Sequence, residues 1–231
     1  MNEVLRQEKK YLMNAVESER LRGILEKVMI VDAHNGTEGY KIRSLYFDTL
    51  NNDDYYDKIE GIELRRKMRL RIYDPEASFA MLELKQKEGP YQRKRSLRLR
   101  REDAESLVAG RHSVLFRYEE PFAAECYGLL HRRCYIPKTI VEYRRKAYIA
   151  RENKIRITLD TAILATESCM DLFSPKLNMY PVIDAFNGVL EVKFNGFLLS
   201  YIKDLLQMAD RSELSVSKYC LARRVGMKFN M

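Results

Sequence analysis

Arg69 and Arg71 stand two residues apart in segment 62–73, where charged and aliphatic side chains alternate. Because side chains alternate between the two faces of a β-strand, both guanidinium groups share one face, and Leu70 and Ile72 take the other. Guanidinium groups bind phosphate oxygens through paired hydrogen bonds. This segment is therefore predicted to be a strand with one anion-binding face and one aliphatic face.

Three other segments carry an acid and a cation two residues apart. The pairs are Glu8 and Lys10, Glu83 and Lys85, and Glu191 and Lys193. One such strand would be an ordinary solvated edge, but several with aliphatic opposite faces indicate a sheet whose charged side lines an enclosed site. The residues predicted to pack outward against helices are Leu70, Ile72, Leu82, Leu84, Ile155, Ile157, Val192 and Phe194.

A set of basic residues is predicted to face this enclosed site, although each taken singly is more often a solvated surface charge. The set is Lys10, Arg69, Arg71, Lys85, Lys94, Arg145, Arg156, Lys193 and Lys218. Like charges ~6 Å apart repel by ~2.8 kcal/mol at an effective dielectric of ~20, so an enclosed basic lumen is costly without an anion. Extended polyanions match this lumen best, since successive phosphate oxygens accept from arginines and lysines.

Three carboxylates lie among these cations and have a separate predicted role. Glu8, Glu83 and Glu191 stand beside the expected phosphates, where carboxylates can hold Mg²⁺ or Mn²⁺. Such a metal neutralises charge that develops during phosphoryl transfer. By contrast, Asp48 and Asp160 are predicted to follow strands and to cap local structure rather than bind metal.

The pattern of elements indicates an α+β protein. Strands are predicted at 3–12, 40–47, 62–73, 78–87, 91–100, 138–150, 154–164 and 188–194. Helices are predicted from the Asn14–Glu17 capping box to Val28 and at 101–109, 119–132, 198–208 and 215–226. A turn and a short helix are predicted between Asp48 and Gly61. These strands, joined mostly as hairpins, favour an antiparallel barrel. An open sheet with its charges facing water is the commoner use of such alternation, and the pattern alone leaves both architectures open.

Composition narrows the class of protein. The 231 residues, 46% hydrophobic and 32% charged, fit a soluble globular chain, which we interpret as a single domain over 1–231. A net charge of +8 indicates an anionic partner, which leaves nucleic acid, anionic membrane and phosphate-rich small molecules open. Four scattered cysteines and three histidines make a zinc site improbable. With no signal peptide and no apolar run of ~18 residues, we expect a cytoplasmic protein without a membrane span.

Familiar phosphate motifs, such as the P-loop and the kinase signature, are absent from the sequence. Charged and aliphatic residues recur instead in a series of short runs: Glu8–Tyr11, Ser44–Asp48, Met68–Arg71, Leu82–Lys85, Val141–Tyr148, Ile155–Asp160, Leu190–Lys193 and Ser217–Tyr219. Together these runs resemble the VTC-type polyphosphate polymerase domain of the triphosphate tunnel metalloenzyme (CYTH-like) superfamily. The resemblance covers nearly the whole chain in the order of the family.

The resemblance implies an eight-stranded closed tunnel with flanking helices, a divalent metal and a triphosphate or polyphosphate ligand. By position, Glu191 would be the main metal ligand, assisted by Glu8 and Glu83. The catalytic set would be Arg69, Arg71, Lys85, Arg156 and Glu191, and the phosphate-binding set the nine cations given above. A shift of one residue in register would exchange Lys94 for Arg93 or Arg95, and Arg145 for Arg144.

The leading hypothesis is transfer of the terminal phosphoryl group of a nucleoside triphosphate, ATP by preference, to a growing inorganic polyphosphate chain. One alternative is an inorganic or nucleoside triphosphatase, in which water replaces the acceptor. The other is a non-catalytic module that binds polyphosphate or nucleic acid. Nucleic acid is not the expected partner, because nucleic-acid modules present an open basic face with exposed aromatics. The membrane-associated members of the family carry sensor and membrane-spanning regions that this sequence lacks, which leaves a separate membrane partner open.

Overall fold

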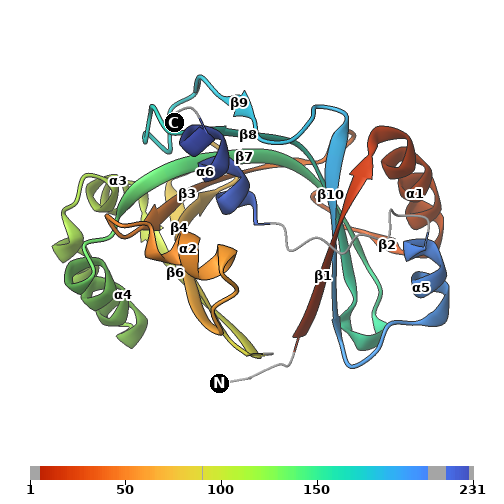
Figure 1. The fold of residues 1–231 in the computed structure, drawn as a ribbon, viewed down its shortest axis with the longest axis horizontal. Helices are drawn as coiled ribbons and strands as arrows, with labels where there is room; N and C mark the ends of the chain where they lie inside the picture. The colour runs from red at the N-terminus through yellow and green to blue at the C-terminus, as the bar shows by residue number, and fades with distance from the viewer. Residues whose placement is uncertain (1–5, 90, 208–216, 229–231) are drawn as a thin grey trace.

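One large antiparallel sheet dominates the structure, a computed structural model that describes residues 6–89, 91–207 and 217–228. Within these ranges eight strands follow the order β1-β10-β8-β7-β3-β4-β5-β6, while β2 pairs with β7 and β9 with β8. The strands are β1 (Arg6–Asn14), β2 (Ile30–Val31), β3 (Tyr40–Asp48), β4 (Leu64–Ile72), β5 (Phe79–Glu88), β6 (Tyr91–Arg100), β7 (Ile136–Ile149), β8 (Arg156–Thr166), β9 (Tyr180–Pro181) and β10 (Asn187–Asn195). The sheet curves into an arch (Figure 1).

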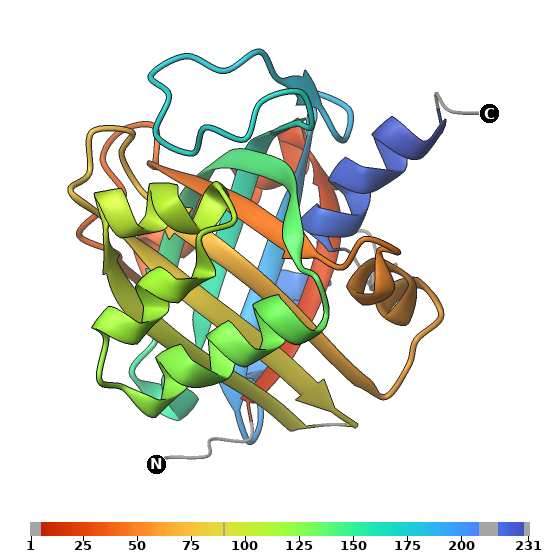
Figure 2. The same ribbon diagram turned by 90° about the vertical axis from the view of Figure 1, so that its left-hand side faces the viewer.

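Helices flank the arch on its outer side and at one end. The α-helices are α1 (Ala15–Val28), α2 (Asp53–Ile59), α3 (Arg101–Val108), α4 (Pro121–Arg132), α5 (Ser200–Leu206) and α6 (Lys218–Lys228). Helices α3 and α4 cover one arm from outside, and α1 and α5 cover the other (Figures 1 and 2). Helices α2 and α6 lie side by side at one end of the arch, where Arg223 donates to Asn52 at 3.1 Å.

The α+β class, the antiparallel sheet and the flanking helices are confirmed, whereas closure into a barrel is not. Strands β1 and β6 are the two edges of the sheet, and no backbone pairing joins them in the described ranges. Alternation of side chains is the same in an open arch and in a closed barrel, so the sequence pattern did not distinguish them. The predicted residues 3–5, 208 and 215–216 lie outside the described part.

Two hydrophobic cores lie between the convex side of the sheet and the helices. Leu70, Ile72, Leu82 and Leu84 belong to one core, which also contains Leu107 of α3 and Leu130 of α4. Ile155, Ile157, Val192 and Phe194 belong to the other, with Leu21 of α1 and Ile202 of α5. Every residue predicted to pack outward is therefore buried under helices, and the opposite side chains of the same strands point into the arch.

The predicted start of α1 is confirmed. The side chain of Asn14 accepts from the backbone N–H of Glu17 at 2.9 Å, and Glu17 accepts from the N–H of Asn14 at 2.9 Å. These bonds satisfy two of the amide groups that a helix leaves free at its start. Helix α1 therefore begins directly after β1 ends, and it covers the outer side of the arm to which β1 belongs.

Asp48 ends β3 and organises the start of α2, as predicted. Its carboxylate accepts from the backbone N–H groups of Thr49 at 2.7 Å, Asp54 at 2.9 Å and Tyr55 at 3.0 Å. The hydroxyl of Tyr219 in α6 donates to the same carboxylate. One buried acid therefore joins a sheet strand to both helices at this end of the arch.

No helix in the described ranges combines the length and apolar character that crossing a membrane requires. The cysteines Cys126, Cys134, Cys169 and Cys220 are all free thiols. The described part of the chain holds no group of three or more histidines, cysteines and acids placed to hold a metal ion.

Asp54 should make stability depend on pH. Burial, and then the adjacent Asp48 carboxylate, raise the pKa of Asp54 to about 7, although the Tyr135 hydroxyl donates to it at 2.8 Å. An acid whose pKa is higher in the folded state loses stability as pH rises from its unfolded value towards that folded value. Between pH 5 and pH 8, we expect Asp54 to lower the free energy of unfolding by about 2 kcal/mol.

Chemical denaturation of the wild type and of Asp54→Asn across this range tests the expectation. Asparagine keeps an oxygen acceptor for Tyr135 but does not titrate, so the variant should gain stability relative to the wild type as pH rises. Parallel pH profiles for the two proteins would contradict the role of Asp54.

Candidate functional site

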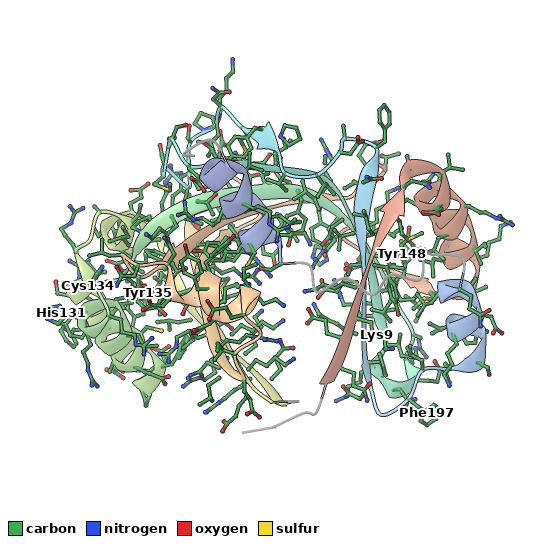
Figure 3. All side chains as sticks on the ribbon, viewed as in Figure 1. Lys9, His131, Cys134, Tyr135, Tyr148 and Phe197 are labelled. Carbon is green, nitrogen blue, oxygen red and sulfur yellow. The ribbon has the colours of Figure 1, made fainter. Side chains whose placement is uncertain are left out.

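Charged side chains from both arms of the arch converge on its concave face. Figure 3 shows nitrogen-tipped side chains pointing from each arm into the space between them. The concave face comprises Glu8, Lys10, Lys67, Arg69, Arg71, Glu83, Lys85, Lys94, Arg145, Arg156, Asp160, Glu191, Lys193 and Lys218. All the cations and acids singled out from the sequence lie on this face, and two further residues, Lys67 and Asp160, join them.

On one arm, three cations surround Glu83. Arg69 lies opposite Glu83 in the β4–β5 register and contacts it at 2.7 Å. Lys94 of β6 contacts Glu83 at 2.6 Å, and Arg71 contacts it at 3.5 Å. Burial would raise the pKa of Glu83, but these charges lower it to about 2. Glu83 is therefore ionised, and the positive charges of the three neighbouring cations balance its negative charge.

The strand registers settle which basic residues point inward. Lys94 faces Glu83, whereas its neighbour Arg95 points outward and pairs with Glu125 of α4. Arg145 is buried on the concave face, whereas the preceding Arg144 is exposed. The structure thus places Lys94 and Arg145, and not the residues beside them, on the concave face.

Lys85 and Glu8 link the two arms. The ammonium group of Lys85, on β5, donates to Glu8, on β1, at 2.9 Å. Lys10 contacts the other oxygen of Glu8 at 2.6 Å. Because β1 and β5 belong to opposite arms of the sheet, side chains span the arch where the backbone does not.

A third group surrounds Asp160, which the sequence analysis misjudged. Asp160 lies inside β8 rather than after a strand, and it is fully buried. Arg145 donates to both of its oxygens, at 2.6 and 2.7 Å, and Lys218 of α6 contacts it at 2.6 Å. Asp160 therefore orients two of the predicted phosphate-binding cations. Aspartate is disfavoured in strands, yet Asp160 falls inside the predicted strand 154–164, so the prediction that it follows a strand conflicted with that span and is wrong.

Glu191 lies next to this group. Lys193 contacts Glu191 at 2.6 Å and Arg145 approaches it at 3.4 Å. Burial opposes its ionisation, but Lys193, Lys10, Arg145 and Lys218 together hold the pKa of Glu191 well below its ordinary value. Glu191 is therefore a buried carboxylate that stays negatively charged.

Arg156 is held apart from these groups. Its guanidinium donates to Asp32 at 2.8 Å and to the Tyr40 hydroxyl at 3.2 Å. It lies opposite Lys193 in the β8–β10 register, so it extends the same face towards one end of the strands.

Three buried polar atoms on this face have no hydrogen-bond partner in the described structure. They are the Nε of Arg71 and the hydroxyls of Ser44 and Thr158. Ser44 lies opposite Arg71, and Thr158 lies opposite Glu191. A buried donor without a partner costs ~1–3 kcal/mol, so such atoms mark positions suited to water or ligand oxygens.

Lys67 is a concave-face cation that the sequence analysis did not select. Its ammonium group donates to the Ser217 hydroxyl at 2.6 Å and lies 5.6 Å from the centre of the Tyr219 ring. Burial lowers the pKa of Lys67, and the nearby Lys10 and Arg69 act in the same direction. Strand spacing could have identified it, because Lys67 stands two residues before Arg69 and therefore shares its strand face.

The carboxylates do not form the predicted group of three metal ligands. Glu83 lies on the opposite arm from Glu191, and no cluster of three or more metal-binding side chains occurs in the described ranges. Glu8 and Glu191 remain close enough for Glu191 to oppose the ionisation of Glu8. Mg²⁺ is commonly held by one or two carboxylates together with substrate phosphates. Glu191 and Glu8 therefore fit a divalent metal that arrives with a phosphate ligand.

Comparison with known proteins identifies a family and a fold. The family described as VTC domain matches residues 5–226. No curated protein matches the sequence. A candidate adenylyl cyclase from Hippeastrum, HpAC1, described as having a dominant triphosphatase activity, is 12% identical with a TM-score of 0.55, covering 94% of this chain and 95% of that one. A candidate adenylate cyclase from Bacillus halodurans is 13% identical with a TM-score of 0.55, over 94% and 96%.

If the concave face receives phosphates, inorganic tripolyphosphate should stabilise the folded chain. At a ligand concentration of ~100 Kd the gain is ~2.7 kcal/mol, which raises the melting temperature of a chain of this size by ~5–10 °C. Arg71→Gln should lose most of this shift, because it removes the buried guanidinium with the unpartnered Nε. Differential scanning fluorimetry measures the effect. The control is Arg144→Gln, which removes an outward guanidinium; equal losses in both variants would argue against binding at the concave face.

Proposed function

This chain belongs to the VTC domain family of the triphosphate tunnel superfamily, and from that premise we propose that it is a metal-dependent polyphosphate polymerase. It would transfer the terminal phosphoryl group of a nucleoside triphosphate, ATP by preference, to the end of an inorganic polyphosphate chain. Members of the superfamily are typically enzymes that handle phosphate, which supports the reaction class.

The observation that carries this proposal is the incomplete neutralisation of the concave face. Cations there outnumber carboxylates, and Arg71 is 9% exposed yet its Nε has no hydrogen-bond partner among the residues that the structure describes. The same-sign charges repel one another unless an anion lies between them. A linear polyanion supplies many oxygens along one line, which suits cations presented by successive strands.

The residues of the chain would act by binding and orienting two phosphate groups. Arg69 and Arg71 project from one arm and Lys10, Lys193 and Arg145 from the other, so donor and acceptor can be gripped from both sides. The bond between the terminal phosphorus and its bridging oxygen breaks, and a bond to the terminal oxygen of the acceptor forms. That oxygen is already anionic, so no protein group has to remove a proton.

Divalent metals typically serve this superfamily, and Glu191 with Glu8 would hold one here. When bound, Mn²⁺ or Mg²⁺ would supply positive charge that offsets the negative charge of the phosphates. The cations that surround Glu191 keep it ionised, and ionisation is the form in which a carboxylate binds metal.

The enclosed tunnel is part of the proposal. The Lys85–Glu8 contact already spans the arch, whereas the edges β1 and β6 are unpaired in the described ranges. A polyanion held by both arms would offset the repulsion between their cations and favour their closer approach.

Glu191→Gln tests the proposed reaction. The purified chain is incubated with ATP and Mn²⁺, and long polyphosphate, free phosphate and nucleoside diphosphate are quantified. The wild type should form polyphosphate, and the variant should lose ~100-fold or more in turnover, the scale seen when one stabilising group of a transition state is removed. Without metal, the variant should bind tripolyphosphate at least as tightly, since one negative charge has left the site.

The matched control is Glu102→Gln, a change at an exposed acid of α3. Free phosphate without polymer would replace the polymerase by the triphosphatase. Full turnover in Glu191→Gln would remove the metal role. Polyphosphate binding without turnover of any triphosphate would leave a binding module.

A further inference from the structure

We propose that the base of a nucleoside triphosphate stacks on a group of aromatic side chains at one end of the concave face. This aromatic rim consists of Tyr40 of β3, Tyr73 directly after β4 and Phe79 of β5, with Arg98 of β6 beside Phe79. The role of the nucleotide as donor rests on the proposed function. The rim adds a means of telling a nucleotide from an inorganic triphosphate.

Towards this end of the arch, the concave face changes from charged to aromatic. On β4, Tyr73 follows Arg69 and Arg71 at the same spacing of two residues. On β5, Phe79 stands two residues before Met81, which lies opposite Arg71. Side chains two residues apart share one face of a strand, so both rings continue the concave face beyond the predicted phosphate-binding arginines.

Tyr40 belongs to the same rim. It lies opposite Arg145 in the β3–β7 register, and directly opposed residues of paired strands share a face. Its ring centre is 6.2 Å from that of Tyr73, and the ring of His34 approaches it edge-on at 6.2 Å. Its hydroxyl accepts from Arg156 at 3.2 Å. The rim is therefore joined directly to a cation of the candidate site.

Phe79 and Arg98 form a second flat surface beside Tyr73. The guanidinium carbon of Arg98 lies 3.8 Å from the centre of the Phe79 ring. In the described ranges no carboxylate pairs with Arg98, so its contact with the ring is not a by-product of an ion pair. A cavity of about 330 Å³, within the size range of small-ligand sites, is lined by Ser78, Phe79, Arg98, Leu99, Arg100 and Tyr118.

The rim is accessible to a ligand at the end of the strands remote from α2. Strand β3 begins at Tyr40 and ends at Asp48, whose carboxylate contacts α2, so Tyr40 lies at the far end. In Figure 2 the loop between β4 and β5 lies on the opposite side of the view from α2. Tyr73 is 48% exposed, and a ring that served only to pack the core would be covered.

Spacing along the strands matches the shape of a nucleotide. At ~3.3 Å per residue, Tyr73 stands ~7 Å beyond Arg71. A ribose separates the base of a nucleoside triphosphate from its first phosphate. Phosphates gripped by Arg69 and Arg71 would therefore leave the base to extend towards the rim, where Tyr73 and Phe79 offer their faces.

Stacking would select nucleotides as a class rather than one base. Every base has a π-face, and stacking on an aromatic side chain changes affinity by ~5–150-fold per base. We therefore expect ATP and GTP to bind with similar affinity, and both to bind more tightly than a triphosphate ester that has no base.

Calorimetry without metal tests the rim by comparing ATP with methyl triphosphate, an ester with the same phosphates and no base. The wild type should bind ATP ~10-fold more tightly. Tyr73→Leu/Phe79→Leu should reduce this ratio to less than ~2-fold and change the affinity for methyl triphosphate itself by less than ~2-fold, because leucine is apolar but has no π-face. Tyr73→Leu alone, at an exposed position, should lower the same ratio and serves if the double variant does not fold.

Two further variants separate stacking from a general structural effect. Tyr73→Phe keeps the ring and should keep the ratio. Phe116→Leu/Tyr127→Leu removes a pair of rings 4.3 Å apart on the outer side of the arch, and it should also leave the ratio unchanged. Equal affinity of the wild type for ATP and methyl triphosphate would overturn the rim. An unchanged ratio in Tyr73→Leu/Phe79→Leu would do the same, as would equal weakening of both ligands.

This outcome is separate from that of the proposed reaction. A chain that forms no polymer from ATP, yet loses its preference for ATP in the rim variants, would keep the rim and reject the polymerase. A polymerase that binds ATP and methyl triphosphate equally well would keep the reaction and reject the rim.

Discussion

Repulsion among like charges on the concave face is the constraint on which the rest of this structure depends. Each strand that presents an aliphatic residue to the helices must present its neighbour to the interior of the arch. The helices bury the outward aliphatic side chains, and anions must offset the repulsion among the inward cations. Glu8, Glu83, Glu191 and Asp160 meet part of that need, each contacted by at least two cations. The positive charge that these four acids do not neutralise defines the candidate site.

Helix α6 depends on the same electrostatic balance. Lys218 reaches Asp160, Tyr219 reaches Asp48, and Ser217 accepts from Lys67, so three consecutive residues dock the helix on three strands. Asp48 also caps α2, and so the end of β3 couples both helices to the sheet. Contacts outside the concave face, such as the one between Tyr219 and Asp48, thereby position Lys218 on that face.

Much of the fold could be predicted because both faces of each long strand are constrained. Segments such as 62–73 and 78–87 alternate clearly, since one side must be apolar and the other carries charge. The two-residue strands β2 and β9 are too short to alternate and were not predicted. Closure of the sheet into a barrel could not be predicted for another reason. Alternation shows which face of a strand a residue occupies, but not whether the two edges of the sheet meet.

The sequence predicted which residues lie on the concave face better than it predicted which acid each cation contacts. Strand spacing puts Arg69, Arg71 and Lys85 on one face, but it does not tell which acid each contacts. Glu83 was grouped with Glu191 as a metal ligand, whereas it lies among the arginines of the opposite arm. Only the curvature of the sheet decides which distant strands face each other, and that depends on packing of the outer helices.

The proposed phosphoryl transfer requires neither a nucleophilic triad nor a phosphate-binding loop. A phosphate chain brings its own anionic oxygen, so the protein has to supply alignment and positive charge rather than a reactive side chain. Side chains fixed on strands supply alignment well, because their backbone is held by neighbours on both sides. Ion pairs with buried acids hold the cations in place before a ligand arrives. Since those acids are fewer than the cations, the pre-formed site keeps an unsatisfied attraction for a polyanion.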